Sequence, residues 1–492
     1  MKAIFGIDLG TTTTVVSRYN IGGSPEAVTL WNGESFIHSA IYFDPGNPDE
    51  PSLFGDAVRD LVGGAQEGAF SQYKRDIGTD RYYAAYGKKY TPCDLTRTML
   101  ERLLKHLISE GDDVSSLTIT VPANFSDKAR TQTIQAAFDA GFPEPIQVID
   151  EPTAAGLYYV HTAPVPLSGK YLVYDFGGGT LDVSVLEVNG RKVDVLMSHG
   201  VRELGGMDLD KIVYELIQNE FFRLKGERFT VNDAGFSVTQ AEKVKEQLSE
   251  SPSRTINIYS LKHGKVNINI SRAQFTEAAR LIFDKSFDCV ENVLKLAFLD
   301  KSEINGVFMA GGTSNIPELE HRLEKFFGFA PVRKNPSRAV ALGAAVYAAY
   351  TVLTDNPERL GGEQRARLGD MKLVESCPYF LGTTAQTNDG YEFNSILLRK
   401  GMPRPASITE SYYVLEDNQE SIRCDVTQHS RDTSDVSDPS LTRIFDQYLQ
   451  LPLGRKAGDE IKVTFSYDQN GVFKGVFLDV ESGVSTEFEG NL

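Results

Sequence analysis

The chain has few of the residues that build disulfide scaffolds and metal-binding clusters. Its 492 residues include only four cysteines and seven histidines. The cysteines are widely spaced, form no C-x-x-C pair, and are Cys93, Cys289, Cys377 and Cys424. This spacing argues against a disulfide framework or a zinc site, and it suits a reducing compartment.

Long apolar runs and an excess of basic residues are also missing. No stretch approaches the ~18 apolar residues of a membrane-spanning helix, and the start MKAIFGIDLG lacks the apolar segment of a signal peptide. The formal net charge of −17 disfavours nucleic acid as a partner. We therefore expect a soluble, cytoplasmic protein that binds neither membranes nor nucleic acid, with room for roughly three to four domain-sized units.

Two segments repeat one pattern, an apolar strand followed by aspartate, glycine and threonine. Residues 3–12 are AIFGIDLGTT, and residues 171–180 are YLVYDFGGGT. Glycine lets the backbone approach a ligand and present N–H groups to phosphate oxygens, and the aspartates Asp8 and Asp175 can hold a hydrated Mg²⁺. Each turn alone fits a plain hairpin tip equally well. Facing each other across a cleft, the two turns would grip a nucleoside triphosphate.

Three further motifs accompany the two turns. Residues 148–155 (VIDEPTAA) predict a strand, an acidic pair and a helix that begins at Pro152. Residues 310–317 (AGGTSNIP) follow an apolar run and predict another strand–glycine–helix junction. Residues 121–130 (VPANFSDKAR) predict a strand that ends at proline and a helix with Ser126 as its N-cap.

In this order, the motifs resemble the ATPase signature set of the seventy-kilodalton heat-shock chaperone family, the DnaK type. The resemblance covers nearly the whole chain. Actin-like proteins and sugar kinases share the two phosphate turns, but they do not combine EPTAA and DFGGGTLDVS with a β-rich C-terminal part. The resemblance implies a two-lobed, actin-like α/β ATPase domain of the duplicated ribonuclease H type, followed by an all-β sandwich. The sequence ends at Leu492, so we expect a short member without the family's helical lid.

Sequence patterns place the domain boundaries. We expect an ATPase domain over 1–368 with lobes at about 1–165 and 166–353, a polar connector over 354–370, an interdomain linker over 369–376 and a β-sandwich over 377–492. Apolar periodicity predicts helices over 96–109 and 339–353. Short β-runs bounded by turns, typical of a sandwich, lie at 396–398, 412–415, 422–426, 461–465 and 472–480.

The resemblance implies a catalytic group. Lys74 would lie beside the γ-phosphate, and Thr180 would offer its hydroxyl to the γ-phosphate and the nucleophile. Asp8, Glu151 and Asp175 would complete the catalytic group and hold Mg²⁺ through water. Without a cation, three carboxylates in one cleft would repel one another and raise their pKa values.

The resemblance also implies binding and coupling residues. Pro122 and Arg130 would form an interdomain relay, and Met371, Leu373 and Val374 would form the apolar part of the linker. Nucleotide contacts would come from Gly10, Thr11, Thr12, Thr13, Gly177, Gly178, Gly179, Gly205, Gly206, Glu242, Lys245, Ser249, Gly311, Gly312 and Thr313.

Four positions depart from the family pattern. Asn315 replaces a common arginine that stacks on adenine, and Ser337 replaces an aspartate near the base. Lys372 puts a charge into an apolar linker, which costs free energy on docking unless its ammonium reaches solvent. Gln147 stands near where J-domain recognition in the family commonly uses a cation, which puts coupling to a standard J-domain partner in doubt.

We expect an ATP-dependent chaperone, with ATP/ADP and Mg²⁺ as cofactors and unfolded or extended peptides as partners. A J-domain protein and a nucleotide-exchange factor are further candidate partners. The alternative is an actin-like scaffold or regulator with one dedicated protein partner, which would not bind a broad set of unrelated peptides. A metabolite kinase is disfavoured, because the late chain is β-rich and Lys74 favours water as the nucleophile.

Overall fold

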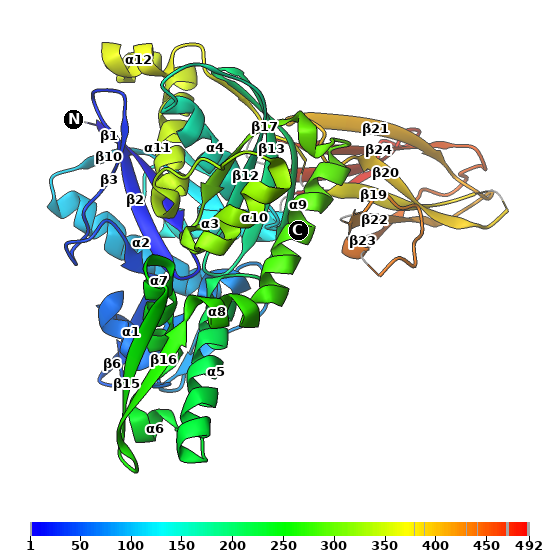
Figure 1. The fold of residues 1–492 in the computed structure, drawn as a ribbon. Helices are drawn as coiled ribbons and strands as arrows, with labels where there is room; N and C mark the ends of the chain where they lie inside the picture. The colour runs from blue at the N-terminus through cyan, green and yellow to red at the C-terminus, as the bar shows by residue number, and fades with distance from the viewer. Residues whose placement is uncertain are drawn as a thin grey trace. The chain divides into compact units, whose positions relative to one another are not determined.

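The computed structural model describes residues 2–377, 379–387, 389–429, 431–439, 441–468 and 472–489. The chain is mixed α/β up to Met371 and all-β beyond it (Figure 1). It divides into two compact units. The first holds the residues up to Asn124, Thr133–Lys192 and His199–Met371, and the second holds Phe125–Gln132, Val193–Ser198 and the residues from Lys372 on.

Two sheets at the centre of the first unit share one plan. In the first, β1 pairs antiparallel with β2 and parallel with β10. In the second, β12 pairs antiparallel with β13 and parallel with β17. The strands of the first sheet are β1 (Lys2–Leu9), β2 (Thr13–Tyr19), β3 (Pro25–Ala27), β4 (Ile37–His38), β10 (Asp113–Val121) and β11 (Ile146–Asp150), in the order β11-β10-β1-β2-β3 with β4 beside β2. The second sheet has five strands in the order β17-β12-β13-β14-β18, and those that lie wholly in the first unit are β12 (Leu167–Phe176), β13 (Leu181–Gly190) and β17 (Ile304–Ala310).

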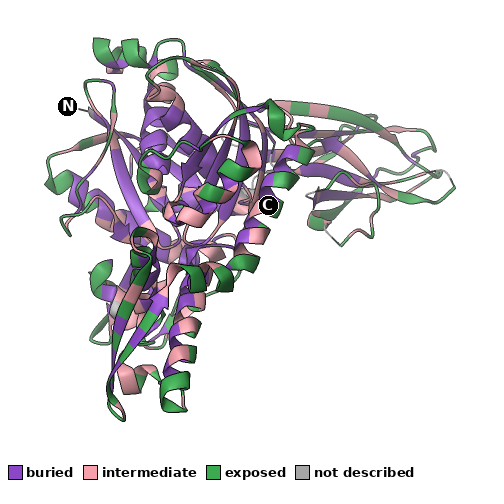
Figure 2. Cartoon of the chain, viewed as in Figure 1, coloured by how far each residue is buried: buried purple, intermediate pink, exposed green. Residues whose placement is uncertain are grey.

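This repetition supports the duplication expected from the sequence. In both sheets the glycine–threonine turn connects the two strands of the antiparallel hairpin, β1 to β2 and β12 to β13. The strands are buried because their apolar residues face helices on both sides, and Figure 2 shows the central strands mostly in purple.

Two buried helices, α4 (Glu151–His161) and α11 (Pro336–Asp355), run together through the middle of the unit. A Cβ built on Gly343 of α11 would collide with the backbone of Ala154 in α4. A Cβ on Gly6 of β1 would likewise collide with the backbone of α11 at Ala345. The alanine-rich sequence of α11 therefore serves close backbone packing, and the helix expected over 339–353 is confirmed with longer bounds.

The remaining elements of the mixed part surround these sheets. On the side of the first sheet they are β5 (Ala40–Asp44), β6 (Asn47–Phe54), α1 (Asp56–Gly63), β7 (Ala69–Ser71), η1 (Tyr73–Asp76), β8 (Tyr83–Ala85), β9 (Lys88–Tyr90) and α2 (Pro92–Ser109). Helix α2 begins with a complete capping box at Thr91 and Asp94, four residues before the predicted start. Helix α3 (Asp127–Asp139) follows β10, and Ser126 Oγ accepts from Ala129 N at 3.3 Å, as its predicted N-cap role requires.

On the side of the second sheet, a long helical excursion separates the hairpin from β17. Its elements are α5 (Gly206–Lys225), α6 (Val231–Ala234), α7 (Val238–Glu250), β15 (Ser253–Ser260), β16 (Gly264–Ser271), α8 (Arg272–Ala278), α9 (Arg280–Leu296) and η2 (Lys301–Glu303), and after β17 come η3 (Gly312–Asn315) and α10 (Pro317–Phe327). The stretch expected to be a plain connector contains η4 (Pro357–Arg359) and α12 (Gly362–Leu368). Gln364 caps α12 by accepting from Gly361 N at 2.9 Å. The sequence analysis did not recognise this cap, because the whole stretch is polar.

The all-β part consists of two four-stranded antiparallel sheets. One has the order β20-β19-β22-β23 and the other β21-β24-β25-β26. Leu381 and Cys424 of the first sheet and Phe465 and Phe477 of the second belong to one buried core cluster. The strands are β19 (Phe380–Gln386), β20 (Glu392–Leu398), β21 (Ala406–Tyr413), β22 (Ser421–His429), β23 (Thr442–Gln450), β24 (Glu460–Tyr467), β25 (Phe473–Asp479) and β26 (Ser485–Glu489). The five predicted β-runs fall on or beside β20, β21, β22, β24 and β25, whereas β23 and β26 were missed.

The segment predicted to be the interdomain linker contains a short strand. Strand β18 (Lys372–Val374) is the neighbour of β14 (Lys192–Val201), most of which belongs to the same unit. Met371 is buried, and Leu373 and Val374 are half-buried. Lys372 is exposed, so the cost of burying its charge does not arise.

The predicted linker segment is joined to the all-β part by a buried ion pair between Glu375 and Arg404. Arg404 Nη2 lies 3.0 Å from Glu375 Oε2, and both side chains are almost fully buried. Arg404 N also donates to Glu375 O at 2.6 Å. Within the described ranges, no helix is long and apolar enough to cross a membrane.

Candidate functional site

The two glycine–threonine turns face each other directly. A Cβ built on Gly178 would collide with the side chain of Thr12, and a Cβ on Gly179 would collide with that of Thr11. Only glycine fits these two positions while the turns remain this close. The structure thus brings together residues that are about 165 positions apart in the sequence, as the pattern of the two turns predicted.

The carbonyl groups of the second turn are bound from one side. Gly177 O accepts from Thr313 Oγ1 at 2.8 Å and from Gly206 N at 3.0 Å. Gly178 O accepts from Met207 N at 2.9 Å. The first turn of α5 and the residues after β17 therefore hold the glycine loop by its oxygens, which explains why Gly205, Gly206 and Thr313 lie with it.

The third carbonyl of the loop is bound from the first sheet's side of the unit. Arg75 Nη2 donates to Gly179 O. The C=O and N–H of one trans peptide point in opposite directions. With all three carbonyls held, the N–H groups of Gly178, Gly179 and Thr180 point away from their anchors, which is the arrangement of a backbone anion site.

Four carboxylates gather around the turns. Asp175 and Asp182 are directly opposite partners in the β12–β13 pairing. Asp8 is the penultimate residue of β1 and accepts from Thr120 Oγ1 at 3.1 Å, and Glu151 begins α4. The ammonium of Lys74 donates to Glu151, and both side chains are buried. All the residues predicted to form the catalytic group therefore lie in this region.

Burial and repulsion by neighbouring carboxylates raise the pKa values of Asp8, Asp175 and Asp182. Burial, and next the charge of Glu151, raises the pKa of Asp8 to about 7, although Lys74 and Thr120 act in the opposite direction. Burial and then Glu151 raise the pKa of Asp182 to about 8. The pKa of Asp175 is raised well above its ordinary value by burial first and then by Glu151, Asp8 and Asp182. The repulsion expected for Asp8 and Asp175 is thus present.

The sequence analysis missed Asp182. It lies inside the DFGGGTLD motif, two residues after Thr180, and the antiparallel register places it opposite Asp175. The signal was available, because the hairpin that brings Gly177–Thr180 into a tight turn must also pair the residues that flank it. Asp182 Oδ1 is buried and makes no hydrogen bond within the described residues.

This group of carboxylates fits a hydrated cation better than a directly bound one. Among the described residues, no three acidic, histidine or cysteine side chains converge closely enough to ligate a metal ion directly. Mg²⁺ usually keeps several of its waters and binds through one or two carboxylates and substrate phosphates. A cation held through water is compatible with buried carboxylates that carry raised pKa values.

The α7 residues expected to contact the nucleoside have different surroundings. Lys245 Nζ lies 2.7 Å from Asp210 Oδ1 and donates to Gly206 O at 3.1 Å, which places it beside the glycine loop. Glu242 instead accepts from Arg59, which belongs to α1 among the elements around the first sheet. Ser249 donates to its own helix at Lys245 O, 3.4 Å away.

The backbone at the end of β17 needs a glycine. Gly311 has φ +80°, and a Cβ there would collide with the backbone of Phe176 and approach Asp175. This close approach places Gly312 and Thr313 beside the second turn. In the first turn, a Cβ on Gly10 would collide with the carbonyl of Thr13.

Two of the departures from the family pattern contact each other. Asn315 Nδ2 donates to Ser337 Oγ at 3.1 Å and to Gly312 O at 3.0 Å, so the amide joins η3 to the start of α11. Gln147 is buried, and its Oε1 accepts from Thr351 Oγ1 at 2.8 Å. Gln147 therefore has a structural role inside the unit.

The two predicted relay residues fall in different units. Pro122 is buried directly after β10 in the first unit. Arg130 of α3 belongs to the second unit, is 1% exposed, and donates from Nε to Phe125 O at 3.4 Å. A guanidinium this deeply buried needs acceptors around it.

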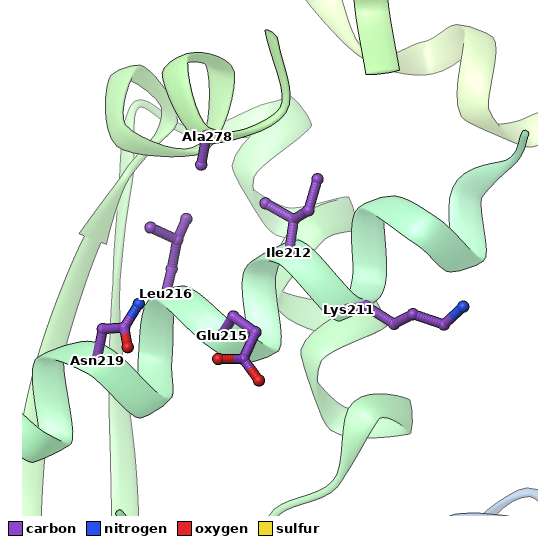
Figure 3. A pocket seen from close by; sticks show the side chains of 6 residues that line it. All are labelled: Lys211, Ile212, Glu215, Leu216, Asn219 and Ala278. Carbon is purple, nitrogen blue, oxygen red and sulfur yellow. The ribbon is translucent and has the colours of Figure 1, made fainter. Parts of the chain in front are cut away.

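A separate apolar groove lies along α5 and α8. It has a volume of about 310 Å³, and in Figure 3 Ala278 faces Ile212 and Leu216. Its other lining residues are Lys211, Glu215 and Asn219. Apolar side chains dominate the groove, so it is unsuited to phosphate groups, and the facing turns remain the candidate site.

Comparison with protein-family models relates the chain to a known family. The model described as Hsp70 protein matches residues 81–488, which is more than half of the chain. The matched region includes Glu151, the second glycine turn and the all-β part. The first turn and Lys74 precede it, so their assignment rests on the geometry described above.

Proposed function

The chain belongs to the Hsp70 family, and from that premise we propose that it is an ATP-dependent chaperone in which ATP hydrolysis by residues 1–368 controls peptide binding by residues 377–492. In this proposal the duplicated sheets are the two lobes of an actin-like ATPase, and the paired four-stranded sheets form a β-sandwich. Strand β18 lies in the linker between them, which we assign to residues 369–376.

One observation carries the proposal. Two glycine–threonine turns from equivalent hairpins lie face to face, with Gly178 against Thr12 and Gly179 against Thr11. Loops of this composition offer N–H and hydroxyl donors without side-chain bulk, which suits a chain of phosphates. Because the two turns belong to different sheets, a triphosphate between them would couple its own hydrolysis to the separation of the lobes.

The residues around the turns then take distinct roles. Gly10, Thr11, Thr12 and Thr13 would hold the phosphates from one side, and Gly177, Gly178 and Gly179 from the other. Lys74 would offset negative charge on the γ-phosphate and orient the attacking water, with Thr180 as a hydroxyl partner. This chemistry consists of positioning and electrostatics rather than covalent catalysis.

Three carboxylates would serve the metal. Asp8, Glu151 and Asp175 would bind Mg²⁺ through its waters. When bound, Mg²⁺ supplies positive charge that neutralises the phosphates and the carboxylates together. The raised pKa of Asp8 supports this role, because a site that destabilises its own ionised carboxylates is prepared for a cation.

The nucleoside would lie toward α5, α7 and the end of β17. Gly205, Gly206 and Lys245, with Gly311, Gly312 and Thr313, would form its surroundings. Glu242 and Ser249 remain candidates, but Glu242 must first leave Arg59 to reach a ribose. Because the amide of Asn315 bonds to Ser337 and Gly312, we expect little stacking of this residue on the base.

The partners follow from the family. Unfolded or extended peptides are the expected ligands of the all-β part, and Pro122, Arg130, Met371, Leu373 and Val374 would transmit nucleotide state to it. A J-domain protein and an exchange factor remain candidate partners. The burial of the uncharged Gln147 supports weak coupling to a standard J-domain.

ATP hydrolysis in the presence of Mg²⁺, measured with and without a set of unrelated unfolded peptides, tests the proposal. We expect slow hydrolysis that several unrelated peptides accelerate, with Lys74→Ala as the inactive control. A chain that hydrolyses no ATP would contradict the enzyme assignment. Hydrolysis that responds to none of the peptides would contradict the chaperone assignment.

A further inference from the structure

We propose that Arg75 is a positioning residue for phosphoryl transfer, because it holds the Gly179–Thr180 peptide in the orientation that presents the Thr180 N–H to the γ-phosphate. The inference rests on the proposed ATPase function and adds a residue to it. Arg75 would act through the loop rather than by touching the phosphate itself.

Two adjacent cationic residues of the 3₁₀ turn η1, Lys74 and Arg75, bind different acceptors. The turn follows Gln72, which has φ 63°, an uncommon conformation for a residue with a side chain. Lys74 donates to Glu151 at the start of α4, whereas Arg75 donates to the carbonyl of Gly179. The strained backbone at Gln72 thus serves a turn whose two cationic residues reach both halves of the site.

The Arg75 bond controls one peptide plane of the loop. The carbonyls of Gly177 and Gly178 are held by groups from their own half of the unit, whereas that of Gly179 is held by Arg75 from the other half. Since the N–H of Thr180 shares a plane with the carbonyl of Gly179, fixing one fixes the other. Glycine has no Cβ to restrict this plane, so an external bond is needed to select its orientation.

If Arg75 served only to stabilise the fold, it would do so through its second partner, Asp208. Arg75 Nη2 lies 4.0 Å from Asp208 Oδ2, and both side chains are partly exposed. Ion pairs of this kind contribute little to stability. Asp208 also has another task, since it accepts from Gly205 N at 3.1 Å and caps α5. The bond to Gly179 is therefore the contact that gives Arg75 a specific role.

The experiment compares Arg75→Ala and Arg75→Lys with Arg81→Met, an exposed arginine in the same segment that pairs with Asp76. Steady-state ATP hydrolysis gives kcat and KM, and calorimetry gives the affinity for Mg²⁺-ATP. For Arg75→Ala we expect kcat to fall about 10–100-fold while KM changes less than about 3-fold, because loss of an oriented group acts mainly in the transition state. Arg75→Lys should be intermediate, and Arg81→Met should match the wild type.

Rescue by a small guanidinium compound separates positioning from folding. Methylguanidinium added to Arg75→Ala should restore part of kcat and should not change the rate of the wild type. The inference is overturned if the wild type hydrolyses ATP and Arg75→Ala keeps the same kcat. It is also overturned if kcat falls only in proportion to a lower folded fraction without rescue. A wild type without ATPase activity removes the proposed function itself, and the inference with it.

Discussion

Lys74 and Glu151 form a buried ion pair that ties the 3₁₀ turn of one half of the site to the first helical turn of α4. Burying a charged ammonium is costly without an opposite charge beside it, and Glu151 provides that charge for Lys74. Loss of Lys74 would leave the buried Glu151 carboxylate without this ammonium. The pair therefore gives Lys74 a fixed position in the site.

Replacing Lys74 by alanine should leave ATP bound and remove most of its hydrolysis. The ammonium donates to Glu151 and opposes the rise in the pKa values of Asp8 and Asp175, and losing an oriented electrostatic group costs ~10²–10³-fold in rate. Single-turnover hydrolysis measures the chemical step, and calorimetry measures the affinity. Lys105→Ala, an exposed lysine of α2, serves as the matched control. An unchanged single-turnover rate in Lys74→Ala would refute the catalytic assignment.

Asp8→Asn and Asp175→Asn should weaken the binding of Mg²⁺-ATP more than that of ATP alone. Each carboxylate supplies charge to the hydrated cation, and loss of an outer-shell partner typically lowers metal affinity 10–100-fold. Titration calorimetry with Mg²⁺ and with EDTA gives the ratio of the two affinities. If the ratio is the same in the variants and in the wild type, the carboxylates do not serve the metal. Asp355→Asn, an exposed acid at the end of α11, is the control.

The acid cluster should make the protein without nucleotide less stable as pH rises. The ordinary pKa of 3.8 for Asp182 becomes about 8 in the folded protein. Between these values the folded state keeps a proton that the unfolded chain has lost, so stability falls with rising pH and levels off above about pH 8.

Asp182→Asn should remove part of that loss. Each unit of raised pKa corresponds to ~1.4 kcal/mol, and a gain of that size should raise Tm by a few degrees at pH 8 and little at pH 4. Thermal unfolding between pH 4 and 9 measures the effect, with Glu187→Gln, an exposed acid on the same strand, as control. Parallel curves for Asp182→Asn and the wild type would show that the carboxylate does not titrate in this window.

Much of the central fold could be predicted from local pattern. The strands β1 and β12, the helices α2 and α11 and five of the later strands have apolar periodicity strong enough to identify them. Strand β23 escaped because charged residues interrupt its alternation, as in Arg443 and Asp446, which pair with Asp425 and Arg423 of the neighbouring strand. Such cross-strand ion pairs depend on register, which no single strand encodes.

For the candidate site too, some residues could be predicted from the sequence and others could not. The two turns and three carboxylates follow from motifs, because each motif places its residues on a strand end or a helix start, whereas Lys74 was assigned from the family resemblance alone. The Arg75 bond to Gly179 and the Arg59 bond to Glu242 connect residues more than 100 positions apart. In the sequence, neither arginine can be told apart from an ordinary surface arginine. Only the folded arrangement of the two halves selects these partners.

The linker offers the last test, on the coupling between nucleotide and peptide. Leu373 and Val374 are half-buried in β18 beside β14, whereas Lys372 is exposed. Full burial of a leucine stabilises by ~1.5–3 kcal/mol, so Leu373→Asp should weaken this pairing substantially. Lys372→Leu should have little effect, because the lysine already points to water, and it serves as the matched control.

Fluorescent-peptide dissociation in ATP and in ADP measures the coupling in all three proteins. We expect the wild type and Lys372→Leu to release peptide faster in ATP than in ADP, and Leu373→Asp to release it at nearly equal rates in both nucleotides. Coupling free energy is reciprocal, so peptide should also change nucleotide affinity in the first two proteins and not in the third. Equal rates in both nucleotides for the wild type would mean that β18 does not transmit the state of the ATPase, and the role proposed for Met371, Leu373 and Val374 would then be wrong.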